Sequence, residues 1–293
     1  MAKALFKLFD LWDSDDEDDL MILRELAKEL DAEEAAAEEA TNNKCTSAMC
    51  QLAYGLYVDE YLRKPTSRDI ACLYSAHEEK HRFKGMLGSI DCMHWKWKNC
   101  PNAWKGQYTS GHQGHSTIVF EAVASYDTWI WHAFFGAAGA NNDVNVLNQS
   151  SLFDDIKNGN APFAPFTVNG NEYTNGYYLA DGIYPDWSTL MKAYSTPTDE
   201  PRAKFKRFQE SARKDVERTF GILQVEDNGF NISWPEEELL RTDEANPNYV
   251  RNRSRSREVR EQEIRDRNIH DQLRNDLTEH IWALPPNFRS LNA

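Results

Sequence analysis

Four short apolar, β-rich runs followed by one long charged segment limit the folds open to this chain. The runs are Met86–Asp91, Ser116–Ser125, Thr128–Phe135 and Tyr177–Asp181, and the long segment spans 200–223. β-Branched and aromatic residues favour strands, whereas apolar residues at helical spacing in the last segment predict a helix. Three consecutive strands, a short helix, a fourth strand and the long helix indicate an α/β (α+β) domain, a mixed sheet flanked by helices.

Two local signals define the segment between the third and fourth strands. Asn141 or Asn142 is a predicted N-cap for a helix that begins at Asp143. Phe166–Tyr173 contains an Asn-Gly turn and is expected to form a small accessory hairpin.

The acidity of the chain is concentrated toward its two ends. Residues 1–44 carry 14 acidic and 5 basic residues, residues 45–224 carry 19 and 18, and residues 225–293 carry 14 and 10, which together give the net charge of −14. A negative net charge opposes broad nucleic-acid binding, because phosphate contacts require clustered Lys and Arg. The near-neutral middle segment removes most of that objection.

The N-terminal part is expected to lie outside the main fold. Residues 1–44 are predicted to be an acidic, largely disordered tail with a transient helix. Residues 45–84 are predicted to be a short helical region with helices over 46–58 and 66–80. The second of these follows a Lys-Pro break and begins at a Thr-Ser pair that can cap it.

The C-terminal part, 225–293, is predicted to be a polar tail. Apolar residues recur there near helical spacing, which predicts an amphipathic helix at about 258–282 that docks either on the core or on a partner. Arg251–Arg257 is a basic Arg/Ser tract, which suits nuclear import or RNA contact but is also common in disordered tails.

Cysteine usage and hydropathy restrict the cellular setting. The five cysteines are an odd number without paired CxxC spacing, and no secretory leader precedes them, so a reducing compartment is expected. The Cys and His residues closest to one another match no common structural zinc spacing. They are Cys92, His94, Cys100, His112 and His115. No apolar run approaches about 20 residues, so no membrane-spanning helix is expected.

Three acidic residues stand at positions that suit metal ligands. Asp91 and Asp181 each end an apolar strand, and Glu217 lies in the long helix beside a buried apolar stripe. Two strand-end carboxylates side by side repel each other unless a cation lies between them. Oxygen ligands of this kind prefer a hard ion, so the spacing suits two Mg²⁺ or Mn²⁺ ions. The simpler interpretation of Glu217 is a surface salt bridge with Arg213 at i−4.

Basic residues cluster near these acids and are candidate phosphate contacts. They are Lys96, Lys98 and Lys105 after the first aspartate, and Lys204, Lys206, Arg207, Arg213, Lys214 and Arg218 around the glutamate. The alternative for both clusters is an ordinary solvated face.

Four motifs in this order resemble one protein family. The runs are Gly85–Trp95, Asn141–Leu147, Tyr178–Pro185 and Arg213–Leu223. Over residues 48–224 the chain is similar to plant transposases of the PIF/Harbinger group. This resemblance implies an RNase H-like catalytic domain over 85–224.

The resemblance also implies roles for individual residues. Asp91, Asp181 and Glu217 would form a DDE triad, with 35 residues between the last two. Asp143, within one of the motifs, is a candidate auxiliary acid; its alternative role is that of a favourable charge at a helix N-terminus. His94 would orient a metal-bound water or contact a phosphate, or else be a structural histidine beside the strand.

Tryptophans near the first aspartate have two interpretations. Trp95, Trp97 and Trp104 suit stacking on exposed bases, but tryptophans at this density more often close a core.

Two features depart from the family pattern. The helical DNA-binding region that usually lies upstream appears as a shortened stretch, and a polar tail begins after Gln224 where the family continues with an apolar helix. Loss of a covering helix would expose apolar sheet surface, at about 25 cal/mol per Å².

Two functions follow as hypotheses. The first is a nuclear, metal-dependent DNA endonuclease or transposase of the DDE type that hydrolyses or transfers phosphodiester bonds, with DNA and a separate Myb-like DNA-binding protein as partners. The second is a host-retained or decaying copy that does not cut and acts as a nuclear binding protein. RNA binding through the Arg/Ser tract is a third, weaker option.

Overall fold

The computed structural model describes residues 63–97, 100–109, 111, 114–226 and 256–285. Every described residue lies within the compact unit Leu62–Ala293. The predicted acidic tail and the helix predicted over 46–58 lie outside the described residues.

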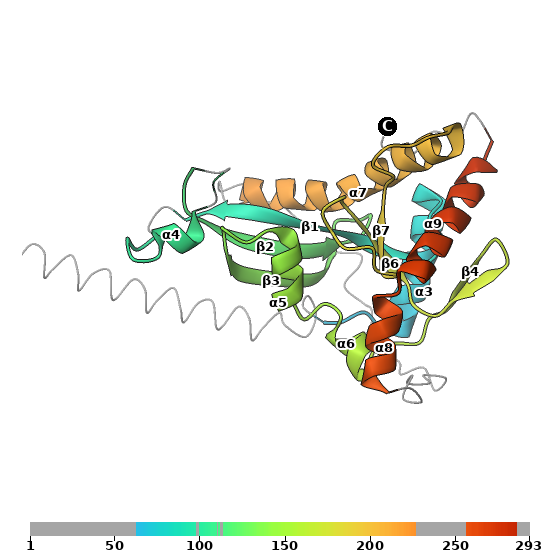
Figure 1. The fold of residues 1–293 in the computed structure, drawn as a ribbon, viewed down its shortest axis with the longest axis horizontal. Helices are drawn as coiled ribbons and strands as arrows, with labels where there is room; N and C mark the ends of the chain where they lie inside the picture. The colour runs from blue at the N-terminus through green and yellow to red at the C-terminus, as the bar shows by residue number, and fades with distance from the viewer. Residues whose placement is uncertain (1–62, 98–99, 110, 112–113, 227–255, 286–293) are drawn as a thin grey trace, which may run out of the picture. The chain divides into compact units, whose positions relative to one another are not determined.

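A five-stranded mixed sheet forms the centre of the fold (Figure 1). Its strands are β1 (Met86–Lys96), β2 (Thr117–Ala124), β3 (Ile130–Ala138), β6 (Tyr177–Ala180) and β7 (Leu190–Lys192). The order across the sheet is β3-β2-β1-β6-β7, with β1, β2 and β3 antiparallel and β6 and β7 parallel to β1. Three antiparallel strands extended by two parallel ones give the mixed sheet that the sequence predicted.

Two strands differ from the prediction. The first strand was expected to end at Asp91 and to be followed by a loop, but β1 continues to Lys96, because residues 92–96 pair with 117–121 of β2. The last strand, β7, was not predicted, because its three residues are too few to show a period of two.

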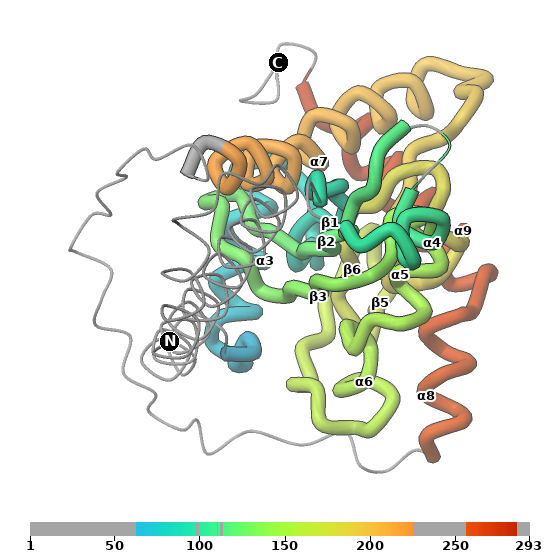
Figure 2. Tube along the Cα trace, turned by 90° about the vertical axis from the view of Figure 1, so that its left-hand side faces the viewer, coloured from blue at the N-terminus to red at the C-terminus, as the bar shows by residue number. Residues whose placement is uncertain are grey.

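Helices cover both faces of the sheet. The helices of the sheet domain are α3 (Ser67–His81), α4 (Lys105–Tyr108), α5 (Asp143–Gln149), α6 (Asp154–Asn158) and α7 (Glu200–Glu226). Figures 1 and 2 show the long helix α7 lying along one side of the strands. On this face Val216 and Phe220 pack against Met93, Ala122 and Ala124. Figure 1 places α5 away from α7, at the strands.

The α5 face of the sheet has its own apolar core. Val146 of α5 packs against Val119 and Ala137, and Leu147 packs in a second cluster with Ile90 and Val123. Both faces of β1 and β2 are therefore buried, which explains why these strands read as continuous apolar runs.

Helix α3 begins where its capping residues predicted. The Thr66 hydroxyl accepts a hydrogen bond from the Asp69 backbone N–H at 3.2 Å, and the Asp69 carboxylate accepts one from the Thr66 N–H at 2.8 Å. Arg63 adds an ion pair to Asp69 at 2.6 Å. This reciprocal arrangement is a capping box, and it confirms a helix start at this point.

The predicted accessory hairpin is also present. Strands β4 (Phe166–Val168) and β5 (Asn171–Tyr173) form a separate two-stranded antiparallel sheet. Asn169 and Gly170 connect them with φ values of 50° and 83°. Asn and Gly adopt positive φ readily, so this dipeptide fixes the tight turn.

The C-terminal part forms two helices where one was predicted. Helices α8 (Arg257–Ile264) and α9 (Arg267–Trp282) are separated at Arg265–Asp266, because Asp266 caps the second with hydrogen bonds to the N–H groups of Asn268 and Ile269. Their apolar residues are buried in the core: Ile264, Leu273, Leu277 and Ile281 are each at most 1% exposed. The tail helices therefore dock on the domain itself.

No described helix combines the length and the apolar character that a bilayer span requires.

Candidate active site at the end of the parallel strand pair

The pairing of β1 with β6 places the first two predicted acids at the same level. Ser89 of β1 is in register with Leu179 of β6, and the two strands are parallel. Asp91 lies two residues after Ser89, and Asp181 lies two residues after Leu179. At this level β6 has ended, whereas β1 continues beside β2. The two carboxylates therefore lie side by side at the carboxyl end of this strand pair.

Local hydrogen bonds hold both aspartates. The Asp91 carboxylate accepts the backbone N–H of Cys92 at 2.9 Å, and the Asp181 carboxylate accepts that of Ile183 at 2.9 Å. Burial raises the pKa of Asp91 and the negative charge of Asp181 adds to the rise, whereas Arg213 opposes it.

Arg213 links Glu217 to Asp91, the first of the two aspartates. Arg213 and Glu217 lie on α7, whose buried Val216 packs against the sheet beside them. One guanidinium nitrogen of Arg213 is 2.6 Å from the Asp91 carboxylate, and the other is 2.7 Å from Glu217. The helical salt bridge considered for Glu217 is thus present, and the same arginine links Glu217 to the first aspartate.

Asp143 joins the group from the opposite face of the sheet. It is the first residue of α5, which Asn142 caps by accepting the Asn145 N–H at 2.9 Å. Burial raises the pKa of Asp143 to about 6, and the charges of Asp91 and Asp181 contribute to the rise. Three aspartates therefore lie within electrostatic reach of one another.

The donor set suits a divalent metal ion by its chemistry. Carboxylate oxygens are the ligands of Mg²⁺ and Mn²⁺, and burial together with the charges of the neighbouring acids raises the pKa of Asp91 and Asp143. Within the described ranges, however, no group of three His, Cys, Asp or Glu side chains is arranged to hold an ion. Arg213 contacts two of the carboxylates instead.

His94 lies on the other face of β1 from Asp91. Successive side chains of a strand point to opposite faces, and Asp91 faces α7 through Arg213. The His94 ring forms a 2.9 Å hydrogen bond with the Thr117 hydroxyl. This contact is the structural role that the sequence left open for His94.

The predicted phosphate contacts divide into exposed and engaged side chains. Lys96, Lys105, Arg207 and Lys214 are exposed, and Lys98 lies outside the described residues. Lys204 binds the backbone oxygens of Trp282 and Leu284, Lys206 binds that of Ser195, and Arg218 binds Asp215. Lys204 and Lys206 tie α7 to neighbouring segments, whereas Arg218 pairs within α7.

One buried acid near the site was not singled out from the sequence. Glu121 of β2 lies opposite Cys92 of β1 and is fully buried. One carboxylate oxygen is 3.3 Å from the His132 ring, and the side chain has no hydrogen bond within the described part of the chain. The sequence signal that could have identified Glu121 is a single Glu within an otherwise apolar strand.

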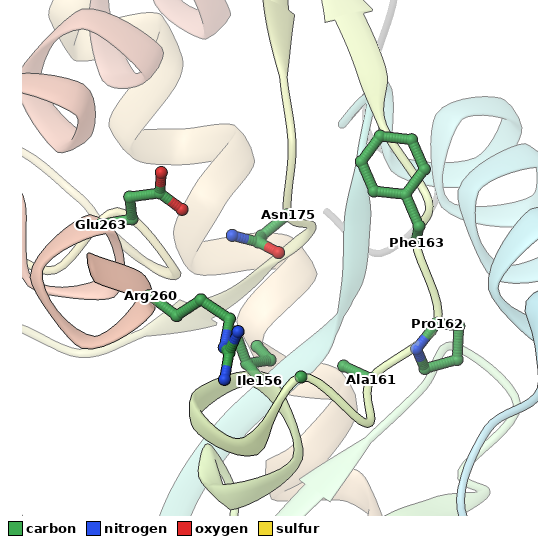
Figure 3. A pocket seen from close by; sticks show the side chains of 8 residues that line it. Ile156, Ala161, Pro162, Phe163, Asn175, Arg260 and Glu263 are labelled. Carbon is green, nitrogen blue, oxygen red and sulfur yellow. The ribbon is translucent and has the colours of Figure 1, made fainter. Parts of the chain in front are cut away.

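Two cavities in the described part of the domain lie apart from this acidic group. A cavity of about 10 Å³ lies between α6, the 159–163 segment and α8, with Asn175, Arg260 and Glu263 around it (Figure 3). A larger one, of about 120 Å³, has Tyr74, Trp131 and Tyr178 in its lining. Neither is lined by Asp91, Asp181 or Glu217.

Comparison with known proteins gives one match. Residues 59–239 match a family described as plant transposon protein, which covers more than half of the chain. The comparisons of the chain with curated proteins and with solved structures give no match.

Proposed function

The chain belongs to the plant transposon protein family, and from this premise we propose that it is a metal-dependent DNA endonuclease or strand transferase of the DDE type. The observation that carries the proposal is the register of β1 and β6, which sets Asp91 and Asp181 side by side. Arg213 links Glu217 to the same place.

In this proposal Asp91, Asp181 and Glu217 hold two Mg²⁺ or Mn²⁺ ions, with Asp143 as an auxiliary acid. Such ions, when bound, activate the attacking oxygen and stabilise the leaving one. The oxygen of water bonds to the phosphorus of a DNA phosphodiester, and the bond to one bridging oxygen breaks. In strand transfer a DNA 3′-hydroxyl takes the place of water.

The chain's own residues prepare the site before any ion binds. The Cys92 and Ile183 N–H groups fix the orientation of the two aspartates. Release of Arg213 from Asp91 and Glu217 frees a guanidinium that suits a DNA phosphate, which is the role predicted for it from the sequence.

The test is nicking of supercoiled plasmid DNA that carries the ends of a plant transposon, with Mg²⁺ or Mn²⁺ added. Wild-type protein is expected to nick it, and Asp181→Asn and Glu217→Gln are expected to lower nicking to background. Glu210→Gln is the matched control, because Glu210 lies on the same helix and is exposed beside Lys206. Undiminished nicking by either triad variant would overturn the assignment.

A copy that binds but does not cut is the second candidate. It is favoured by Arg213, which bridges two of the acids, and by the lack of a ready ion-binding group in the described ranges. Metal binding measured by calorimetry, without nicking, would support this candidate. A nuclear location and a Myb-like partner protein are parts of either proposal, and nuclear fractionation and co-purification test them.

A further inference from the structure

The segment between β1 and β2 differs in charge from the rest of the chain. From Cys92 to Phe120 it has no Asp or Glu, but three Lys and three His, in a chain of net charge −14. Lys96 and Lys105 are exposed. Positive charge without nearby acids is the electrostatic pattern that attracts a nucleic-acid backbone.

The same segment carries an aromatic cluster that closes no core. Trp97, Trp104 and Tyr108 lie together, with ring centroids 4.9 Å apart for Trp97–Tyr108 and 6.2 Å apart for Trp104–Tyr108. Trp104 is 51% exposed, and α4 has no buried residue. We call Lys96, Trp97, Trp104, Lys105 and Tyr108 the aromatic finger.

Trp95, in contrast to Trp104, packs against a buried apolar cluster. It packs against the cluster of Met93, Ala122, Val216 and Phe220 under α7. The core interpretation therefore holds for Trp95, whereas the exposure of Trp104 suits stacking on bases.

Hydrogen bonds hold the base of the finger in place. The Trp97 N–H donates to the Ser116 carbonyl at 2.9 Å, and Thr109 forms a bridge with Ser116 and a 3.1 Å hydroxyl contact. The finger thus continues the β1–β2 ladder, and Figure 1 shows α4 beyond the end of β1, far from α9.

The distance from the finger to the acids suits one bound DNA. Trp97 follows Asp91 by six residues, which along a strand is about 20 Å. At 3.4 Å per nucleotide, about six nucleotides span that distance. A single DNA end can therefore contact both places.

We propose that the aromatic finger binds the DNA strand beside the cleavage site, with an unpaired base stacked on Trp104 and with Lys96 and Lys105 on the flanking phosphates. The proposal rests on the proposed function for its substrate. The finger adds a preference for DNA with an unpaired base, because an aromatic face can stack only on a base that has left the duplex stack. The substrate is then DNA with an unpaired end or a locally opened end.

The experiment measures binding of the full-length protein in EDTA, so that no cutting is needed. Two DNAs are compared by fluorescence anisotropy: a blunt duplex and the same duplex with a single-stranded extension that contains 2-aminopurine. Wild-type protein is expected to bind the extended DNA more tightly and to quench the 2-aminopurine. Trp104→Ala is expected to weaken binding to the extended DNA on the order of 10-fold and to abolish the quenching. Trp104→Phe should retain most of both.

Matched variants separate the finger from general effects. Trp282→Ala removes another tryptophan of similar exposure, 49%, on α9, and should bind like wild type. Affinity falls as salt rises, and Lys105→Ala should make this dependence weaker: the slope of log affinity against log salt should be less negative by about 0.7. The binding assay contains EDTA and the nicking assay contains Mg²⁺ or Mn²⁺, so failure of nicking and failure of the finger are separate results.

Four results would overturn the proposal or a part of it. The first is Trp104→Ala that binds the extended DNA as tightly as wild type. The second is an equal loss on the blunt duplex, which would remove the role for an unpaired base. The third is a changed oligomeric state in sedimentation with unchanged DNA binding, which would make the patch an interface between copies. Tighter binding of the same extension made of RNA would overturn the choice of DNA.

Discussion

Arg213 shows how one residue can decide the state of a site. Its guanidinium contacts Asp91 and Glu217 together, at 2.6 and 2.7 Å, while Asp181 stands beside the first of them in register. A positive charge at this point offsets the repulsion between the acids. A metal ion bound by the same carboxylates must therefore compete with the arginine.

Replacing Arg213 by Ala tests this competition. Without metal the variant is expected to be less stable by about 2 kcal/mol, because the largely buried Asp91 loses its partner. Added Mg²⁺ should then raise the melting temperature more in the variant than in wild type. Chemical denaturation measures the free energy of unfolding, and differential scanning fluorimetry measures the melting temperatures. Lys214→Ala is the control, since Lys214 lies on the same helix and is exposed, and equal Mg²⁺ shifts in all three proteins would contradict the prediction.

His77 gives a prediction about pH at a place away from the acids. Its Nδ1–H donates to the Met86 carbonyl at 2.9 Å, and its Nε2 accepts the Tyr126 N–H at 3.3 Å, so the folded protein requires the neutral ring. Burial lowers the pKa of His77 from 6.5 to about 4; the Met86 carbonyl and the charges of Asp215 and Asp127 oppose the fall, and His81 adds to it.

The sign of the effect follows from this lowered pKa. Between pH 6.5 and pH 4 the unfolded chain binds a proton at His77 and the folded chain does not, so stability falls as the pH falls through this window. The loss should reach about 3 kcal/mol below pH 4. Chemical denaturation across this range measures it, and His77→Asn should flatten the dependence. A variant with the same pH slope as wild type would show that other groups cause it.

At the scale of elements, the contact between α9 and the β4–β5 hairpin joins two parts far apart in the sequence. The Asp276 carboxylate accepts the Asn171 amide at 2.8 Å and also the Tyr173 hydroxyl, and the Asn169 amide donates to the Asp276 carbonyl at 2.8 Å. The Asn-Gly hairpin therefore serves as a docking point for the C-terminal helix.

Asp276→Ala should weaken this docking. Two donors, on Asn171 and Tyr173, would lose their acceptor, and the free energy of unfolding should fall by about 1–3 kcal/mol. Hydrogen exchange should become faster in α9 and in the hairpin, but not in α3. The exposed Gln272→Ala is a control on the same helix. Unchanged exchange in the hairpin would mean that the apolar contacts of α9 suffice.

The element predictions succeeded or failed according to how local their signals were. The capping box of α3, the Asn142 cap of α5 and the Asn-Gly turn operate within a few residues, so the sequence shows them. The extension of β1 to Lys96 depends on pairing with β2, and the three-residue β7 depends on β6. Such pairing overrides local propensity and is invisible in a single segment.

At the scale of the whole molecule, part of the segment predicted to be a polar tail packs on the sheet domain and contributes to its core. Four apolar side chains of α8 and α9, Ile264, Leu273, Leu277 and Ile281, are each at most 1% exposed. The covering helix that seemed missing after Gln224 led to the expectation of exposed apolar surface. The tail helices bury apolar surface of the core instead.

Ending the chain after residue 255 tests this interpretation. Each of the four side chains contributes about 2 kcal/mol through burial, and their sum is comparable with the whole stability of a domain. The shortened protein should therefore bind a hydrophobic dye and should lose a cooperative thermal transition. Ending the chain after residue 285 should have neither effect. A cooperative transition without α8 and α9 would show that the sheet and α7 suffice.

The sequence by itself determined most of the strands and helices, their caps and turns, and the acids that end two strands, because these depend on neighbours along the chain. Only the tertiary structure decided which strands are adjacent, and hence that Asp91 and Asp181 lie side by side. It also decided that Arg213 bridges two acids and that α9 covers the core. These features join residues on separate elements, and a pattern of local spacing carries no information about such contacts.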